Sequence, residues 1–141
     1  MSITLILSIG TFIATAAVAD YRPKLAAQEK IKKTDEKLVL ELVRNPDILA
    51  AVAAANHGLF TVGFAAETHN LEKNAQAKLL AKSLNMIAAN QVGPQQGFEQ
   101  DNNALLVLWR GGRQELALAH KDVLARTLIE LIAQRYQQEK K

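Results

Sequence analysis

The chain has 141 residues, of which 49% are hydrophobic, 22% charged and 5% aromatic, and this composition argues for one folded domain and against disordered, collagen-like or repeat chains. Cysteine is absent, which excludes thiol nucleophiles, zinc ribbons and thiolate clusters in this chain and slightly favours the cytosol. The net charge of +3 indicates a mild preference for anionic partners and is too small to predict nucleic-acid binding.

The first 19 residues carry no charged side chain. Residues 3–19 lack the positive n-region of a signal peptide, although Ala17, Val18 and Ala19 imitate a signal-peptidase site. The same stretch is too short and too rich in Ser, Thr and Gly for a membrane span. We therefore predict a buried strand that ends in a polar loop, with a cleaved signal peptide as the alternative.

The next segments alternate between strand and helix patterns. Residues 37–43 alternate polar and apolar side chains and predict a strand. A helix is expected to follow as far as about Asn56, with Asn45 as its N-cap and Pro46 in its first turn, where the missing N–H is harmless. Residues 59–65 form a second apolar run that predicts another strand.

The second half of the chain continues the alternation. Residues 70–84 are rich in Ala, Leu and Lys and predict a helix, and residues 86–89 predict a short strand ending at Asn90. Residues 93–103 read as a polar loop. The pattern therefore places a third strand directly before a long connection.

A hairpin and a helix are predicted to complete the fold. Residues 104–110 and 114–117 form two apolar runs joined near Gly111 and Gly112, which readily adopt positive φ. The last helix is expected to start near His120 and to end in a solvated tail over residues 137–141. Its apolar face is predicted to consist of Val123, Leu124, Thr127, Leu128, Leu131 and Ile132.

This alternation predicts an α/β fold with a mostly parallel sheet covered by helices, because parallel strands need crossover connections. Ligands bind such sheets beyond the carboxyl ends of the strands. The rule selects residues 16–20, 45–48, 64–68 and 90–91, which we expect on one rim of the sheet as a pocket with several polar groups. Ordinary loop chemistry and helix caps are the alternative interpretation.

Two groups of lysines are candidate anion ligands. Lys30 and Lys32 alternate along an extended segment and could point to one side, where a cationic strap would neutralise phosphate oxygens. Lys78 and Lys82 are spaced i,i+4 on one helical stripe, where like charges repel unless an anion lies between them. Most short lysine runs are solvated surface, which is the favoured alternative for the first pair. Lysines that keep their ammonium groups in water explain the second pair equally well.

Common catalytic motifs are absent from the sequence. It contains no GxGxxG, Walker A, HExxH or GxSxG pattern. The three histidines, His57, His69 and His120, have no metal-ligand spacing, so surface or capping roles are expected for them.

Five motifs, in this order, resemble the bacterial phosphopantothenate-cysteine ligase family, usually the carboxy-terminal half of a bifunctional coenzyme A biosynthesis protein. They are AAVADYRP at 16–23, EKIKK at 29–33, NPDI at 45–48, VGFAAET at 62–68 and DNNA at 101–104. The resemblance extends from about Thr11 to the end of the chain. It implies a Rossmann-like, mostly parallel sheet with flanking helices and a C-terminal β-hairpin, without the N-terminal strands of the family fold.

The resemblance also implies an activity. The carboxylate of 4'-phosphopantothenate would attack the α-phosphate of CTP to give an acyl-cytidylate, which cysteine would convert to product with release of CMP. Lys30 is the implied catalytic residue, and Asp20 is the implied ligand of Mg2+. The implied nucleotide-binding residues are Ala16, Asp20, Lys30, Asn45, Pro46, Asp47, Ile48, Phe64, Lys78 and Lys82. A cytoplasmic homodimer with a contact at the hairpin around Gly111 is implied too, with neither nucleic acid nor membrane as partner.

The sequence departs from the family pattern in three respects. The glycine-rich strand–turn–helix and the Ser-Ser-Gly segment of the family are not found before Ala16. Gln91 stands where the family usually has Asp beside the nucleotide pocket, and Asn85 replaces another common Asp. We therefore predict that residues 1–141 form a single, N-terminally truncated ligase domain. A fragment without activity on its own is the main alternative, and a small secreted protein is the third.

Overall fold

The computed structural model describes residues 10–16, 18–25, 29, 38–55, 58–93 and 101–140. The chain divides into two compact units. The sheet unit comprises Met1–Thr15 and Leu49–Lys141, and the arm unit comprises Ala16–Ile48.

The sheet unit is built on a five-stranded sheet in the order β1-β4-β5-β6-β7. Its strands are β1 (Thr11–Ile13), β4 (Phe60–Glu67), β5 (Met86–Gln91), β6 (Asn102–Trp109) and β7 (Gly112–His120). The first three run parallel to one another, and β6 and β7 form an antiparallel hairpin at the other side. The prediction of an α/β fold with parallel strands and a C-terminal hairpin is therefore confirmed.

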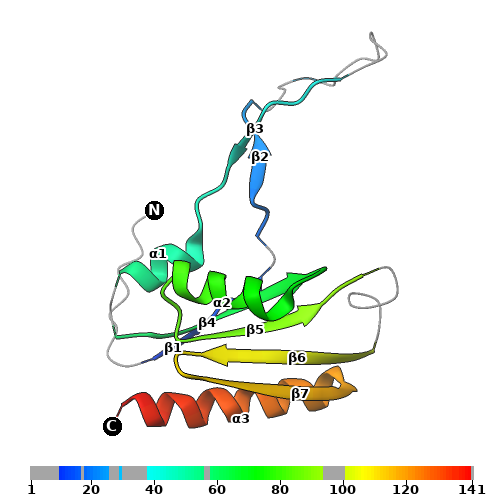
Figure 1. Ribbon diagram of the computed structural model, residues 1–141. Helices are drawn as coiled ribbons and strands as arrows, with labels where there is room; N and C mark the ends of the chain where they lie inside the picture. The colour runs from blue at the N-terminus through cyan, green and yellow to red at the C-terminus, as the bar shows by residue number, and fades with distance from the viewer. Residues whose placement is uncertain are drawn as a thin grey trace. The chain divides into compact units, whose positions relative to one another are not determined.

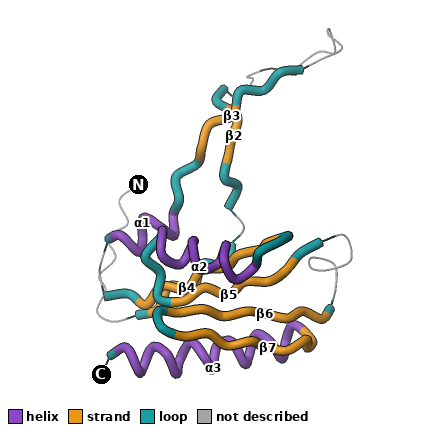
Figure 2. The backbone as a smooth tube through the Cα atoms, viewed as in Figure 1, coloured by secondary structure: helices purple, strands orange, loops and turns teal. Residues whose placement is uncertain are grey.

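Helices cover both faces of this sheet (Figure 1). On one face lie α2 (Leu71–Ala81) and the part of α1 (Ile48–Ala54) that belongs to the sheet unit, and on the other lies α3 (Lys121–Glu139). The tube in Figure 2 shows the same three layers of helix, strand and helix. Because alternate residues of a strand point to opposite faces, each strand supplies both hydrophobic layers.

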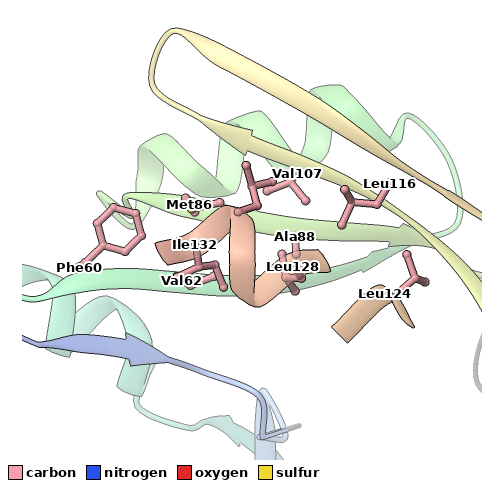
Figure 3. Close-up of a cluster of buried hydrophobic side chains, with 10 residues drawn as sticks. Phe60, Val62, Met86, Ala88, Val107, Leu116, Leu124, Leu128 and Ile132 are labelled. Atoms are coloured by element: carbon pink, nitrogen blue, oxygen red, sulfur yellow. The ribbon is translucent and has the colours of Figure 1, made fainter. Parts of the chain in front are cut away.

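The two layers are visible as two buried clusters. Figure 3 shows the one between the sheet and α3, where Phe60 and Val62 of β4 meet Leu124, Leu128 and Ile132 of α3. The second cluster lies between the sheet and α2. It includes Ala65 and the side chains that lie next to Gly63. Its buried members are Ala65, Ala75, Leu79, Leu84, Ile87, Ala89, Leu106 and Leu108, with Leu49, Ala53 and Leu71 packed against them.

Local sequence explains how α2 ends. Ser83 takes a left-handed conformation with φ 53°, and its N–H donates to the carbonyl of Leu80 at 3.1 Å. The N–H of Leu84 donates to the carbonyl of Leu79 at 3.0 Å, which completes a Schellman-type end. The chain then enters β5 with Leu84 buried between the helix and the sheet.

Several predicted boundaries are wrong. The strand expected over residues 37–43 is β3 (Leu42–Arg44), residues 38–41 are exposed and not in a strand, and Lys37 lies outside the described residues. It pairs antiparallel with β2 (Tyr21–Pro23), which the sequence reading missed, in a separate two-stranded sheet of the arm unit. Helix α1 begins at Ile48 and not at Pro46, because the Asn45 side chain bonds elsewhere and does not cap it.

The ends of the chain also differ from expectation. Of the predicted strand over residues 3–19, only Thr11–Ile13 is strand within the described residues, and none of its three residues is fully buried, because β1 lies at the edge of the sheet. Helix α3 extends to Glu139, through most of the predicted tail. Val123 is 55% exposed and does not join the buried face of α3. No helix in the described part of the chain is long and apolar enough to cross a membrane.

Candidate functional site

One rim of the sheet gathers polar residues from several strands. The parallel strands β4 and β5 end side by side, with Ala66 opposite Asn90 and Glu67 opposite Gln91. The antiparallel partner β6 begins at this same rim and β7 ends there, with Asn102 opposite His120. The structure therefore brings together the predicted places 64–68 and 90–91. The carboxyl end of β1 points to this rim as well, because β1 runs parallel to β4.

Glu67 anchors the α2 side of this rim. Its Oε1 accepts a hydrogen bond from Lys78 Nζ at 2.5 Å, and its Oε2 accepts one from Asn74 Nδ2 at 3.1 Å. The hydrogen bond from Lys78 is the main cause that lowers the pKa of Glu67, and Asn74 adds to it against the opposing effect of burial. The carboxylate is therefore ionised at neutral pH, and Lys78 lies at the rim beside a negative charge.

Phe64 lies on the other side of β4. It has the same strand parity as Val62, which packs against α3, whereas Glu67 has the parity of Ala65, which packs against α2 residues. Phe64 is 43% exposed, so its ring is open to solvent although it belongs to the central part of the strand. A ligand that touched both Phe64 and Lys78 would have to pass over the end of the sheet.

Lys82 follows one turn after Lys78 at the C-cap of α2. Its backbone N–H donates to the carbonyl of Lys78 at 3.1 Å, so the two lysines occupy successive turns of one stripe, as the spacing predicts. Lys82 is half-buried. Helix α2 starts after the end of β4 and finishes just before the start of β5, which places Lys78 nearer to the carboxyl ends of these strands than Lys82.

Within the arm unit, two of the predicted motifs lie next to each other. The Asn45 side chain donates from Nδ2 to the carbonyl of Ala19 at 2.7 Å and accepts at Oδ1 from Arg22 Nη1 at 3.0 Å. The backbone N–H of Asn45 donates to the carbonyl of Asp20 at 2.8 Å. The carboxamide therefore holds the NPDI segment against the AAVAD segment, and this role replaces the predicted N-cap.

The remaining predicted residues of the arm unit are mostly exposed. Ala16, Asp20, Pro46, Asp47 and Ile48 all have exposed positions. Residues 45–48 follow the two-stranded sheet of the arm, so the prediction that they lie at the end of a strand in the main sheet is wrong. Lys30, the predicted catalytic residue, and Lys32 lie outside the described residues.

A magnesium ion would have to be held without a preformed cage. Among the described residues, no group of three or more His, Asp or Glu side chains is arranged to bind a metal. Mg2+ commonly binds through one or two carboxylates together with phosphate oxygens of a substrate. The exposed carboxylate of Asp20 fits that mode, in which a nucleotide brings most of the ligands.

Asn85 lies far from the rim, at the amino end of β5. Its backbone N–H donates to the carbonyl of Thr61 at 3.1 Å, near the start of β4. Asn85, which replaces another common Asp of the family, therefore lies away from the rim, whereas Gln91 lies at the rim. A hollow of about 280 Å³ is present at this opposite end, and Thr61, Asn85, Tyr136 and Glu139 are among its lining residues.

The sequence reading gave no site role to the residues that β6 and β7 bring to the rim. Asp101, Asn102 and Asn103 stand at the start of β6, and His120 ends β7. The carbonyl of Asp101 accepts the N–H of Lys121 at 3.0 Å, which joins the start of β6 to the start of α3. The predicted hairpin could have indicated these residues, because the two open ends of a hairpin lie together at the end opposite its turn.

Comparison with known proteins supplies a family and a fold. Residues 4–136 match the model of the DNA/pantothenate metabolism flavoprotein C-terminal domain. The chain is 50% identical over 125 residues to the coenzyme A biosynthesis bifunctional protein CoaBC of Vibrio cholerae, covering 86% of this chain and 31% of that protein. It is 48% identical over 130 residues to the protein of that name from Escherichia coli K12, covering 89% and 32%. The chain thus spans about a third of the length of these curated relatives.

Solved structures agree with the sequence relatives. The crystal structure of the C-terminal domain of a coenzyme A biosynthesis bifunctional protein CoaBC superposes with a TM-score of 0.70 at 34% identity, covering 94% of this chain and 57% of that one. A DNA/pantothenate metabolism flavoprotein from Streptococcus pneumoniae gives a TM-score of 0.67 at 22% identity, covering 87% and 62%, and supports the fold alone.

Proposed function

Because the chain belongs to the family of the DNA/pantothenate metabolism flavoprotein C-terminal domain, we propose that it catalyses the CTP-dependent ligation of 4'-phosphopantothenate to cysteine. The observation that carries the proposal is the 50% identity to a protein named for coenzyme A biosynthesis. Under this proposal both units are parts of one ligase domain. The protein works in the cytoplasm on small molecules, and it assembles as a homodimer.

The reaction has two steps. The substrate carboxylate attacks the α-phosphorus of CTP, the bond to the β-phosphate breaks, and pyrophosphate leaves. The amine of cysteine then attacks the acyl carbon of the acyl-cytidylate, loses a proton, and the bond to CMP breaks. Both steps concentrate negative charge on phosphate oxygens, and positioned cations lower the energy of such states.

The roles that we assign to the residues follow the family resemblance. We assign Ala16, Asp20, residues 45–48, Phe64, Lys78 and Lys82 to the nucleotide. We assign Lys30 to the acyl-cytidylate as its neutralising cation. The Lys78 ammonium at the rim, held beside the ionised Glu67, supports the assignment of an anion site there.

Mg2+, when bound to the triphosphate, would neutralise part of its charge, and Asp20 is the residue assigned to hold it. The chain's own contribution is to bind and orient. The hydrogen bonds that join Asn45 to Ala19 and Asp20 keep the two arm segments in a fixed relation, so the Asp20 carboxylate is presented from a preorganised loop.

A binding experiment with three nucleotides tests the proposal. Cytosine offers an amino donor at N4 and acceptors at O2 and N3, and a site that pairs these groups rejects bases that leave its own polar groups unpaired. We expect CTP to bind more tightly than ATP and UTP in calorimetry with Mg2+ present. Formation of CMP that requires both 4'-phosphopantothenate and cysteine would then establish the ligation. Equal affinity for the three nucleotides would contradict the proposal.

The alternative is a truncated or degenerate fragment of the ligase that has no activity on its own. It is favoured by the share of the relatives that the chain covers, which is 31% for the Vibrio cholerae protein. The assay separates the two. The alternative gives no CMP from this chain, and CMP appears once the chain is joined to the upstream part of that relative.

A further inference from the structure

Glu67 occupies a fixed place at the functional rim. It is the last residue of β4 and stands opposite Gln91, the last residue of β5. Its backbone carbonyl accepts the N–H of Val92 at 2.9 Å, so the backbone is held on the β5 side. Its side chain is only 12% exposed and points to α2, where it meets Lys78 and Asn74. A mostly buried carboxylate at the end of a strand needs partners, because burial disfavours its charge.

Both carboxylate oxygens have such partners. Oε1 accepts from Lys78 Nζ at 2.5 Å and Oε2 accepts from Asn74 Nδ2 at 3.1 Å. Asn74 Nδ2 also donates to the carbonyl of His69 at 3.0 Å, so the amide that supports Glu67 is itself fixed. The carboxylate cannot rotate away from Lys78 without losing a bond to Asn74. Glu67 is therefore a rigid acceptor for a flexible lysine.

Among the residues that the structure describes, Glu67 is the one side chain bonded to the Lys78 ammonium, and Lys78 is otherwise largely open to solvent. Its side chain is 46% exposed, against 12% for Glu67. An ammonium has three N–H donors, and one bond to Glu67 leaves two for another acceptor. A free lysine side chain loses rotamer entropy when a ligand fixes it, and a contact that already fixes the side chain reduces that cost.

We infer that Glu67 is a positioning residue that holds the Lys78 ammonium at the rim, ready to receive a phosphate oxygen of the nucleotide. This inference rests on the proposed function. Glu67 does not touch the nucleotide, since its two oxygens are already bonded on the α2 side. The negative charge of Glu67 opposes the approach of an anion. Anion binding is favoured because the fixed Lys78 ammonium lies between the Glu67 carboxylate and the anion.

A purely structural role for the pair makes a different prediction. If the bond between Glu67 and Lys78 only ties α2 to β4, its loss lowers the melting temperature and leaves anion affinity unchanged. If Glu67 acts through Lys78, its loss weakens anion binding only while Lys78 is present. A double-mutant cycle distinguishes these roles.

The experiment compares wild type, Glu67→Gln, Lys78→Gln and the double variant by calorimetry. The probes are CTP with Mg2+ and inorganic tripolyphosphate, and melting temperature is recorded for each protein. We expect Lys78→Gln to weaken both probes about tenfold, Glu67→Gln to weaken them about threefold to tenfold, and the double variant to match Lys78→Gln. Glu72→Gln is the matched control, because it removes a carboxylate from α2, the helix of Lys78, and the Glu72 side chain is 54% exposed and paired with Arg113. It should bind both probes as wild type does.

The outcomes are distinct. A double variant whose loss is the product of the two single losses overturns the inference, and so does a Glu67→Gln protein that binds as tightly as wild type or more tightly. If Glu67→Gln does not fold, Glu67→Asp, which withdraws the carboxylate by one methylene, takes its place in the cycle. Coupled binding of tripolyphosphate without a preference for CTP keeps the positioning role and removes the proposed nucleotide specificity. A wild-type chain that binds neither probe overturns both proposals.

Discussion

Asn85 and Thr61 join the amino ends of β5 and β4 through one carboxamide. Asn85 Oδ1 accepts the backbone N–H of Thr61 at 2.8 Å and its hydroxyl at 3.0 Å. The Nδ2 of the same side chain donates to Glu139 Oε2 at 2.7 Å, which adds α3 to the connection. Thr61 is 2% exposed, so water cannot replace these bonds.

Asn85→Ala should lower the free energy of unfolding by about 1–3 kcal/mol, because it leaves buried polar groups of Thr61 without their acceptor. Urea unfolding measured by circular dichroism gives the value. Asn102→Ala is the control, since Asn102 is exposed and its replacement should change stability by less than about 0.5 kcal/mol. Equal stability of Asn85→Ala and wild type would show that the network contributes nothing.

Gly63→Ala should destabilise the sheet unit. A Cβ at Gly63 would lie 2.8 Å from Leu84 Cδ1 and 2.9 Å from Leu49 Cδ2, so both leucines would have to move within a packed layer. Overpacking of this kind costs about 1–3 kcal/mol. Gly93→Ala is the matched control, because a Cβ there meets nothing within 4 Å. The two variants are compared by thermal unfolding, and similar melting temperatures would contradict the prediction.

The stability of the protein should depend on Glu67 at acid pH. Its pKa in the folded state is lowered, chiefly by the hydrogen bond from Lys78, so the ionised form stabilises the fold at neutral pH. That contribution is complete above the ordinary glutamate pKa of about 4.3 and is lost as the pH falls through the lower folded value. Between about pH 6 and about pH 3, the free energy of unfolding should fall less in Glu67→Gln than in the wild type. Parallel pH profiles for the two proteins would contradict this assignment.

The open edge of β1 should promote self-association. Within the described part of the chain β1 pairs only with β4, and the bonds of Gly10 and Ala14 to β4 leave the N–H and C=O of Thr11 pointing to the other side. Thr11→Pro removes an outward N–H and should reduce the oligomer fraction seen by light scattering. Phe12 alternates with Thr11 along the strand and, like Gly10 and Ala14, directs its backbone groups toward β4. Phe12→Pro should therefore lower the melting temperature instead. A monomeric wild type with a cooperative melt and no dye-binding apolar surface would disprove this expectation.

The segment at 30–33 should affect catalysis chiefly through Lys30. In a chain joined to the upstream part of the Vibrio cholerae relative, Lys30→Gln should lower the overall rate more than CTP affinity. The acyl-cytidylate should accumulate, because the negative charge that develops on CMP as it leaves is no longer neutralised. Lys32→Gln should do less. Lys24→Gln should do almost nothing, because Lys24 forms an exposed ion pair with Glu41. CMP release with and without cysteine measures these effects, and equal behaviour of Lys30→Gln and Lys24→Gln would disprove the catalytic role.

Much of the sheet unit could be predicted from the sequence because its signals are local. The apolar run of β4, the helix pattern of α2 and the hairpin turn at Gly111, with φ 80°, each lie within a few residues. The family resemblance rests on five short motifs and is confirmed by the match over residues 4–136. From these elements the rim at the ends of β4 and β5 follows directly.

The arm unit could not be predicted in the same way. Strand β2 has three residues, all exposed, and it exists because it pairs with β3 about twenty residues later. The capping pattern at Asn45 was misleading for a related reason: the carboxamide finds Ala19 and Arg22 as partners, and neither is close in sequence. Contacts of this separation depend on tertiary structure, which local propensity does not encode. The bond between Glu67 and Lys78 could not be predicted either, because the two residues are 11 positions apart and lie on a strand and a helix.

The hairpin of β6 and β7 has its open ends at the rim formed by the carboxyl ends of β4 and β5, and its turn at Arg110 and Gly111. At about 3.3 Å per residue, the eight residues of β6 separate the turn from the rim by roughly 25 Å. The exposed Arg110 side chain is thus a labelling site that lies far from the rim. It lies within the homodimer contact proposed for the hairpin. A bulky label placed there would block subunit pairing and leave nucleotide binding intact, so that assembly and ligand recognition can be studied one at a time.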